Sequence, residues 1–292
     1  MQKRILLTGA NGQLGQCLLE ATSAFPQFEW VATDRSSLDI TDRTAVPAAV
    51  SSCDWCINCA AYTAVDKAER DADTARRINA DGPRFLAEAC AERDIPLIHI
   101  STDYVYHSRQ NTPFREDDPV HPQGVYAATK LEGDLAVLSA HARKAMIVRT
   151  SWVYGLYGHN FLKTMPRLGR ERPVLHVVAD QIGSPTSAHD LAEALLCVVS
   201  GVGEGRFKET DLGGIWHYSN EGVASWYDFA AAIMDIAGLP CRVLPIETAD
   251  YPTPAQRPPF SVLNKSKIKR AFGLDIPHWR QSLKAVMGRM NP

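Results

Sequence analysis

The stretch KRILLTGANGQLGQ, residues 3–16, decides the fold of this chain. Residues 3–8 form an apolar run typical of a β-strand, and residues 13–22 repeat leucine at helical spacing. Three glycines cluster where these two segments meet. The stretch therefore predicts a strand, a tight turn and a helix in succession.

Gly9, Gly12 and Gly15 are spaced as G-x-x-G-x-x-G, which suits a phosphate-binding turn. Without Cβ atoms the backbone amides can approach a pyrophosphate, and the following helix presents its positive N-terminus to that charge. The alternative is a strand-to-helix turn that only packs closely.

A second apolar run, residues 28–33, ends at Asp34, and this acid favours the dinucleotide interpretation. A carboxylate at that strand end can accept hydrogen bonds from the adenosine ribose. Arg35 follows directly, and its guanidinium can pair with a 2′-phosphate. NADPH and NADH therefore both remain open as cofactor.

Further apolar runs lie at residues 54–59, 96–100 and 145–149, and helical patterns separate them. Strands that alternate with helices of this kind imply right-handed crossovers and a parallel sheet covered on both faces. We therefore expect an α/β fold with a doubly wound parallel sheet of the Rossmann type. Residues 1–155 form the predicted dinucleotide-binding domain.

Beyond residue 155 the alternation loosens, and residues 156–292 are expected to form mainly a smaller α+β substrate-binding lobe. Some later segments are expected to return to the first domain. The predicted elements are helices at 187–200 and 225–237, with glycine-rich loops at 201–205 and 213–214.

The segment YPTPAQRPP, residues 251–259, holds four prolines, which exclude a helix interior or a central strand. It predicts a stiff loop that carries Arg257. A lone loop arginine is usually solvated, yet a guanidinium on a rigid loop beside a cleft suits a diphosphate.

The chain has a net charge of −2 and a sequence pI near 6.5, so no basic field favours nucleic acid or an anionic membrane surface. No stretch approaches a membrane span, and the first residues read as a strand and not as a signal peptide. We expect cytoplasmic residence, with neither nucleic acid nor membrane as a partner. Seven cysteines, an odd number, fit reduced thiols better than a disulfide framework.

Cys53, Cys56 and Cys59 are spaced as Cys-x2-Cys-x2-Cys, a pattern that a zinc ion or an iron–sulfur cluster can use. The surrounding residues predict a short buried strand, in which side chains alternate between the two faces. Cys56 and Cys59 then point to opposite sides, and no fourth cysteine lies nearby in sequence. We therefore expect no bound metal.

Tyr126 and Lys130 stand four residues apart in VYAATK and lie on one face of a helix. An ammonium beside a phenol makes the phenol easier to deprotonate, which is the electrostatic arrangement that a ketone reductase needs. Tyrosine and lysine at this spacing also occur on many solvated helices, so the pair alone decides little.

Ser101 and Thr102 lie at the end of the fourth predicted strand, where ligands bind in an open parallel sheet. Because successive strand side chains diverge, one hydroxyl points into the cleft and the other away from it. For either residue alone, a hydrogen bond to the turn backbone is the alternative role.

Four ordered motifs resemble the extended short-chain dehydrogenase/reductases, namely TGANGQLG at 8–15, CAA at 59–61, STD at 101–103 and YAATK at 126–130. The chain more closely resembles the dTDP-4-dehydrorhamnose reductase family, through AYTAVDKAE at 61–69, STDYVY at 101–106, RTSWVY at 149–154, DQIGSPT at 180–186 and RPPFSVLN at 257–264. That resemblance implies reduction of the C4 ketone of dTDP-4-dehydro-6-deoxy-L-mannose to dTDP-L-rhamnose, with hydride from NADPH or NADH.

The resemblance also implies the role of each catalytic residue. Tyr126 is the general acid, Lys130 favours the tyrosinate and holds the nicotinamide ribose, and Thr102 hydrogen-bonds the carbonyl oxygen. The residues that it implies for cofactor binding are Gly9, Asn11, Gly12, Gln13, Leu14, Gly15, Asp34, Arg35, Asp39, Ile40, Ala61, Tyr62, Thr63, Tyr126 and Lys130.

On the substrate side, the resemblance implies that Thr102, Asp103 and Trp152 contact the sugar nucleotide. Arg257 is expected to face its phosphates. Trp152 also has a structural alternative, because an indole that follows a strand is more often part of a core than a ligand platform.

Two other functions remain open. A sugar-nucleotide epimerase or dehydratase that retains its NAD would share the fold, although Tyr104 after Asp103 stands where a dehydratase would have glutamate. A regulatory subunit would bind the dinucleotide and a partner protein without turnover. The intact Thr102, Tyr126 and Lys130 argue against that second function.

The oligomeric state is also open, with a monomer and a homodimer equally compatible with the sequence. Some family members hold magnesium at a dimer interface through an acidic residue on the first helix. Cys17 stands at the aligned position here, which argues against a metal-linked dimer. The expected partner is a small molecule, the dTDP-sugar substrate.

Overall fold

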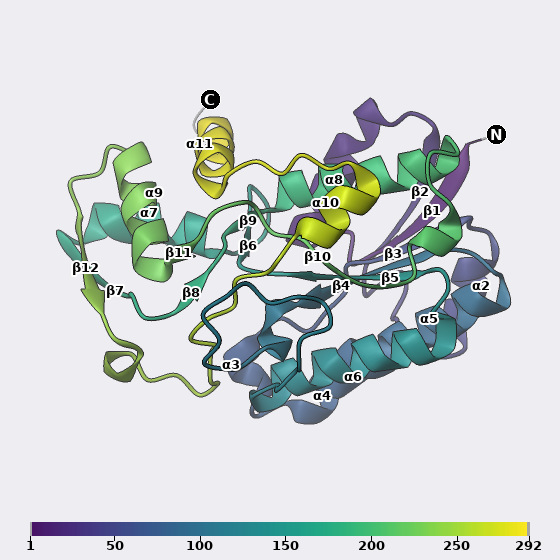
Figure 1. Ribbon diagram of the computed structural model, residues 1–292, viewed down its shortest axis with the longest axis horizontal. Helices are drawn as coiled ribbons and strands as arrows, with labels where there is room; N and C mark the ends of the chain where they lie inside the picture. The colour runs from purple at the N-terminus through teal and green to yellow at the C-terminus, as the bar shows by residue number, and fades with distance from the viewer. Residues whose placement is uncertain (1, 291–292) are drawn as a thin grey trace.

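A six-stranded parallel sheet with the strand order β10-β5-β4-β3-β1-β2 forms the centre of the computed structural model, which describes residues 2–290 (Figure 1). This confirms the doubly wound parallel fold expected from the sequence. Its strands are β1 (Lys3–Thr8), β2 (Phe28–Thr33), β3 (Trp55–Asn58), β4 (Leu97–Thr102), β5 (Ala145–Thr150) and β10 (Gly214–His217).

Helices cover both faces of this sheet. One face carries α1 (Gln13–Glu20), α8 (Ala188–Gly203) and α10 (Ser266–Phe272), and the other carries α2 (Ala45–Ser51), α5 (Gly82–Glu92) and α6 (Gly124–His141). Between β3 and α5 the chain forms α3 (Val65–Ala68), α4 (Ala72–Arg76) and the π-helical stretch η2 (Arg77–Asp81).

The rest of the chain forms a smaller layer of helices and short strand pairs beside the sheet (Figure 1). Its helices are α7 (Phe161–Glu171), α9 (Trp226–Ile236) and α11 (Trp279–Met290). Its strands pair as β6 (Val153–Tyr154) with β9 (Thr186–Ser187), β7 (Val174–Val178) with β12 (Arg242–Ile246), and β8 (Ile182–Gly183) with β11 (Ala224–Ser225). Short 3-10 turns complete the fold at η1 (Ala21–Ala24), η3 (Asp103–Val105), η4 (Glu209–Asp211) and η5 (Thr248–Asp250).

Three segments differ from the expected elements. The first helix ends at Glu20 and continues as the 3-10 turn η1. Helix α8 runs on to Gly203, into a segment expected to be a loop. Gly214, also expected in a loop, begins β10, which pairs with β5 at the edge of the sheet. Glycine is compatible with a loop, a helix or a strand, so packing against the sheet determines the structure at the end of α8 and the start of β10.

The alternation of side chains along the strands divides the core into two halves. In β3, Ile57 packs with α1 and α8, whereas Cys56 packs with α2 and α5. Cys59 contacts the first of these clusters, so Cys56 and Cys59 lie on opposite sides, as predicted. Among residues 2–290, no three His, Cys, Asp or Glu side chains are grouped so that they could hold a metal ion.

The described residues include no helix of the length and apolarity needed to span a membrane. The longest helix is α6, which packs against the sheet through residues such as Val137.

A buried ion pair fixes α6 against the sheet. Arg149 in β5 donates from Nε to Oδ2 of Asp134 in α6 at 3.0 Å, and both side chains are almost completely buried. Arg149 also donates from Nη1 to the Tyr106 hydroxyl at 2.7 Å. Since a charge in the core needs a partner, this pair sets the register of α6 on β5.

We expect Arg149→Met to lower the free energy of unfolding by about 3–5 kcal/mol, because it removes the guanidinium that pairs with the buried Asp134 carboxylate. Urea denaturation at neutral pH measures this change. In the control, Arg167→Met removes an exposed pair with Glu171 and should cost less than about 1 kcal/mol. Equal losses in the two variants would contradict the structural role of the buried pair.

Candidate active site

The glycine turn that follows β1 presses closely against the chain that follows β3. Gly9 has φ +67°, and a Cβ there would lie 2.6 Å from the backbone nitrogen of Ala60. At Gly15, a Cβ would lie 2.7 Å from the Cα of Ala10. Gly12 caps α1 without a side chain, so the first amides of α1 face outward at the positive end of the helix.

A cavity of about 570 Å³ lies over this turn, at the carboxyl ends of β1, β2 and β3. The strand order changes direction between β1 and β3, and ligands of open parallel sheets bind at that point. The predicted cofactor residues that line the cavity are Gly9, Asn11, Gly12, Asp34, Arg35, Asp39, Ile40 and Ala61.

Asp34 is held rigidly at one end of the cavity. Its Oδ1 accepts from the hydroxyl of Ser36 at 2.7 Å and from the amide of Ser37 at 3.1 Å, and its Oδ2 accepts from Asn11 Nδ2 at 2.6 Å. The hydrogen bonds from Ser36 and Ser37 lower the pKa of Asp34 to about 2, so it is ionised. An ionised carboxylate retains capacity to accept a ribose hydroxyl.

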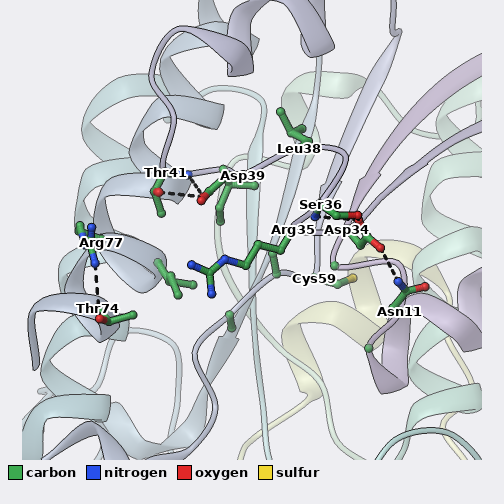
Figure 2. A pocket seen from close by; sticks show the side chains of 16 residues that line it. Asn11, Asp34, Arg35, Ser36, Leu38, Asp39, Thr41, Cys59, Thr74 and Arg77 are labelled. Atoms are coloured by element: carbon green, nitrogen blue, oxygen red, sulfur yellow. Dashed lines mark hydrogen bonds between the residues drawn. The ribbon is translucent and has the colours of Figure 1, made fainter. Parts of the chain in front are cut away.

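Two arginines provide positive charge to the same cavity. Figure 2 shows Arg35 extending across the cavity from the end of β2, towards the segment that carries Arg77 and Thr74. Arg77 donates to the Thr74 hydroxyl at 3.5 Å. Sequence reasoning missed Arg77, because no local pattern on a helix between two strands indicates which side faces a ligand.

These features fit a dinucleotide. A turn without Cβ atoms admits the pyrophosphate, Asp34 accepts from the ribose, and Arg35 can neutralise a 2′-phosphate. Arg35 lines the cavity together with Asp39, and its positive charge contributes to lowering the pKa of that carboxyl. The other predicted cofactor residues lie outside the cavity wall, with Gln13, Leu14 and Gly15 in α1, and Tyr62 and Thr63 ahead of α3.

Tyr126 and Thr102 meet at the end of β4. Tyr126 is in the first turn of α6, and its ring packs edge-on against Tyr104 with ring centroids 5.5 Å apart. Burial raises the pKa of Tyr126 to about 12, and a hydrogen bond with Thr102 acts in the opposite direction. Tyr126 is therefore a phenol at neutral pH, which is the protonation state of an acid.

Lys130 lies one turn further along α6 and is almost completely buried. Its Nζ donates to the carbonyl of Ile100 at 2.8 Å and lies 3.4 Å from Nε2 of His99. Burial lowers the pKa of Lys130 to about 8, and the nearby Asp134 acts against this. From the sequence we expect the Lys130 ammonium to lower the pKa of Tyr126. In the structure, burial has the larger effect and raises that pKa.

Asp103 directly follows β4 and is buried beside Thr102. Its Oδ1 accepts from the Thr102 hydroxyl at 3.2 Å, while Oδ2 has no partner among the described residues. Burial raises the pKa of Asp103 to about 7, and the nearby hydroxyls of Ser261 and Thr102 oppose the shift. Ser101, the alternate residue on β4, lies near Asp134, on the other side of the strand.

Trp152 stands in a strained backbone conformation with φ +47°. Its ring stacks on Trp226 at a centroid distance of 3.8 Å, and a Cβ on Gly183 would come within 2.6 Å of it. One face of the indole is therefore part of an aromatic cluster, which supports the structural alternative weighed for this residue. Its half-buried ring leaves room for a ligand contact as well.

Arg257 lies on the proline-rich loop and forms an ion pair with an acid that is distant in sequence. Its Nη2 lies 2.9 Å from Oδ2 of Asp66 in α3. The guanidinium also lines a second cavity of about 380 Å³, whose walls include Phe161, His176, Gln181 and Trp226. Arg257 thus borders an apolar cavity in the smaller layer, distinct from the cavity over the glycine turn.

Residues 3–291 match the family model described as the RmlD substrate binding domain. This chain belongs to that family. The dTDP-4-dehydrorhamnose reductase of Aggregatibacter actinomycetemcomitans is 42% identical over 97% of this chain and 98% of its own length. The reductase of the same name from Mycolicibacterium smegmatis is 43% identical over 99% of this chain and 87% of its own. The resemblance inferred from the motifs is confirmed.

Solved structures agree with these relatives. The dTDP-4-dehydrorhamnose reductase of Bacillus anthracis, solved in complex with NADP, is 38% identical, and the match covers 99% of this chain and 100% of that one with a TM-score of 0.92. A dTDP-glucose 4,6-dehydratase from Streptomyces venezuelae has a TM-score of 0.81 at 20% identity, so it shares the fold alone.

We expect Arg35→Ala to weaken NADPH binding roughly tenfold or more and to leave NADH binding within about twofold, because only NADPH carries the 2′-phosphate. Fluorescence titration with each cofactor measures both dissociation constants. Arg93→Ala, an exposed arginine outside the cavity, serves as the matched control. An equal loss of affinity for the two cofactors would contradict a 2′-phosphate role for Arg35.

Proposed function

We propose that this chain reduces the C4 ketone of dTDP-4-dehydro-6-deoxy-L-mannose to dTDP-L-rhamnose, the last step of dTDP-rhamnose synthesis. The cofactor is NADPH or NADH. Family membership supports this reaction, because relatives with about 40% identity over nearly the whole chain carry the name of that reductase. The observation that carries it is the half-buried Tyr126 phenol in the first turn of α6, which lies beside Thr102 at the end of β4.

When bound, the reduced nicotinamide supplies the hydride for this reaction. Tyr126 holds a proton at its phenol oxygen and donates it to the C4 oxygen as negative charge develops there. Thr102 donates a hydrogen bond to the same oxygen, in place of its present bond to Asp103. A donor of this kind stabilises the transition state by about 3 kcal/mol.

Lys130 provides a positive charge in the buried region below Tyr126. Its ammonium is anchored on the Ile100 carbonyl and compensated by Asp134 further along the same helix. A fixed charge in a region that excludes water stabilises a developing anion more strongly than the same charge in solvent. By the family match, Lys130 also holds the nicotinamide ribose.

The sugar nucleotide is expected to bind in the smaller layer. Asp103, with an oxygen that has no partner in the described residues, can accept from a sugar hydroxyl. Trp152 stacks on Trp226, which lines the second cavity. Arg257 can pair with the diphosphate at the mouth of the second cavity, whose aromatic and apolar walls suit a nucleobase. We therefore propose that residues 1–155 hold the cofactor and residues 156–292 mainly the dTDP-sugar.

Two finer statements belong to this proposal. All seven cysteines are unpaired, which is the usual state in the reducing cytoplasm where we place the reaction. A monomer and a homodimer are equally compatible with the proposed chemistry, since the catalytic residues come from one chain.

A spectrophotometric assay tests the reaction. The enzyme is supplied with the 4-keto sugar nucleotide and with NADPH or NADH, and the loss of absorbance of the reduced nicotinamide is recorded. We expect stoichiometric oxidation by the parent protein and a loss of at least about 100-fold in Tyr126→Phe, whose cofactor affinity stays near that of the parent. Tyr227→Phe, on α9 and outside both cavities, is the control. The proposed reaction fails if neither cofactor is oxidised, and the proposed acid fails if Tyr126→Phe turns over at the parent rate.

We expect kcat/KM to fall as the pH rises above about 8, because Lys130 loses its charge there. The ammonium is present below that pKa and absent above it, whereas the pKa of Tyr126, about 12, lies too high to produce this limb. The groups that face Lys130 are His99, Asp134 and Cys59. Rates measured from pH 6 to 10 check the expectation, and a flat profile up to pH 10 would contradict it.

A further inference from the structure

A carboxylate from another helix caps the first turn of α6, the turn that carries Tyr126. Glu69 Oε1 accepts from the backbone nitrogen of Val125 at 2.8 Å. Gln123, the N-cap residue of α6, makes no side-chain capping bond. Because the first amides of a helix lack internal partners and carry positive charge, Glu69 satisfies one of them and complements the helix dipole.

The glycine at the start of α6 makes this contact sterically allowed. Gly124 has φ +79°, and a Cβ there would lie 2.6 Å from Glu69 Oε1. A Cβ at this position would push the Glu69 carboxylate away from Val125, and a residue other than glycine would also be strained in this backbone conformation. The contact thus depends on two matched positions, Glu69 and Gly124, that are far apart in sequence.

Glu69 also stands on the segment that leads away from the cofactor cavity. Ala61 lines that cavity, and α3 (Val65–Ala68) follows a few residues later, with Glu69 as its C-cap residue. Figure 1 shows α3 beside α6. The bond from Val125 to Glu69 therefore links the helix of the proton donor to the segment that borders the cofactor.

A second carboxylate, three residues earlier on α3, holds the proline-rich loop. Asp66 accepts from Arg257 Nη1 at 3.2 Å and Nη2 at 2.9 Å, and also from the backbone nitrogen of Ala255 at 3.2 Å. The hydrogen bonds from Arg257 lower the pKa of Asp66, so the acid is charged. Residues three apart share a helix face, so α3 contacts both α6 and this loop from one side.

We propose that Glu69 and Asp66 are positioning residues, through which α3 sets Tyr126 and Arg257 relative to the cofactor segment. This inference rests on the proposed function, because that function makes Tyr126 the acid and Arg257 the partner of the diphosphate. Glu69 acts on the chemical step through the start of α6. Asp66 acts on substrate binding through the loop at residues 251–259.

The Glu69 part is tested with two variants. Glu69→Ala removes the acceptor, and kcat falls roughly 10- to 100-fold because small misplacements of reacting groups have effects of that size. NADPH affinity stays within about twofold, since the cavity wall is unchanged. Glu69→Gln keeps an acceptor oxygen and recovers most of kcat. Asp73→Ala, an exposed acid on α4 with no ion pair among the described residues, is the control.

The Asp66 part predicts a different kinetic change. Asp66→Ala raises KM for the sugar nucleotide roughly tenfold and changes kcat little, because Arg257 and the loop lose their anchor. An unchanged KM would overturn this part. A lower KM would also overturn it, since Asp66 would then compete with the diphosphate for Arg257. A loss of stability alone would lower the amount of folded enzyme and hence the apparent kcat, but it would leave KM unchanged.

Hydrogen exchange gives a readout that does not need turnover. Glu69→Ala increases amide exchange in peptides that cover residues 124–130, whereas Glu69→Gln and Asp73→Ala leave it at the parent level. If the parent enzyme oxidises neither NADPH nor NADH with the 4-keto sugar nucleotide, the proposed function fails and exchange alone decides whether Glu69 holds α6. If the parent turns over and Glu69→Ala matches it in kcat, or Glu69→Gln is as slow as Glu69→Ala, this inference fails and the proposed function stands.

Discussion

The close contact between Gly9 and Ala60 is the constraint on which the rest of the site depends. It brings the turn after β1 against the chain after β3, with too little space for a Cβ at Gly9. This contact forms where the strand order changes direction, so it places the N-terminus of α1 at the edge of the cavity. The same contact fixes where the segment from Ala61 to α3 leaves the sheet, and that segment reaches both α6 and the proline-rich loop.

Hydrogen bonds between buried polar side chains connect this contact, across the sheet, to Lys130. Asn58 Oδ1 accepts from the hydroxyl of Thr8 at 2.6 Å and from the amide of Ala60 at 3.1 Å. Its Nδ2 lies 3.0 Å from Nδ1 of His99, whose Nε2 lies 3.4 Å from Lys130 Nζ. Each group is buried, so each bond costs more to break than it would at the surface. The ends of β1, β3 and β4 are thereby held together with α6.

Sequence patterns that extend over only a few residues predicted the strands, the turn and the first helix well. The strand, turn and helix around Gly9 and the acid at Asp34 follow from apolar periodicity and glycine spacing, and the structure has the parallel sheet that they imply. The opposite directions of Cys56 and Cys59 follow from strand alternation. The sequence could not indicate that Arg77 would face the cavity, because its position depends on how a helix docks.

The parallel sheet and the tight turn after β1 could be predicted from the sequence, because they depend on side-chain periodicity and on the backbone freedom of glycine. Only the tertiary structure decided the protonation states and the supporting contacts. Tyr126 and Lys130 are neighbours on any helix, but burial raises the pKa of the first to about 12 and lowers that of the second to about 8. Burial and contacts such as Glu69 with Val125 arise from packing between distant segments, which no local pattern encodes.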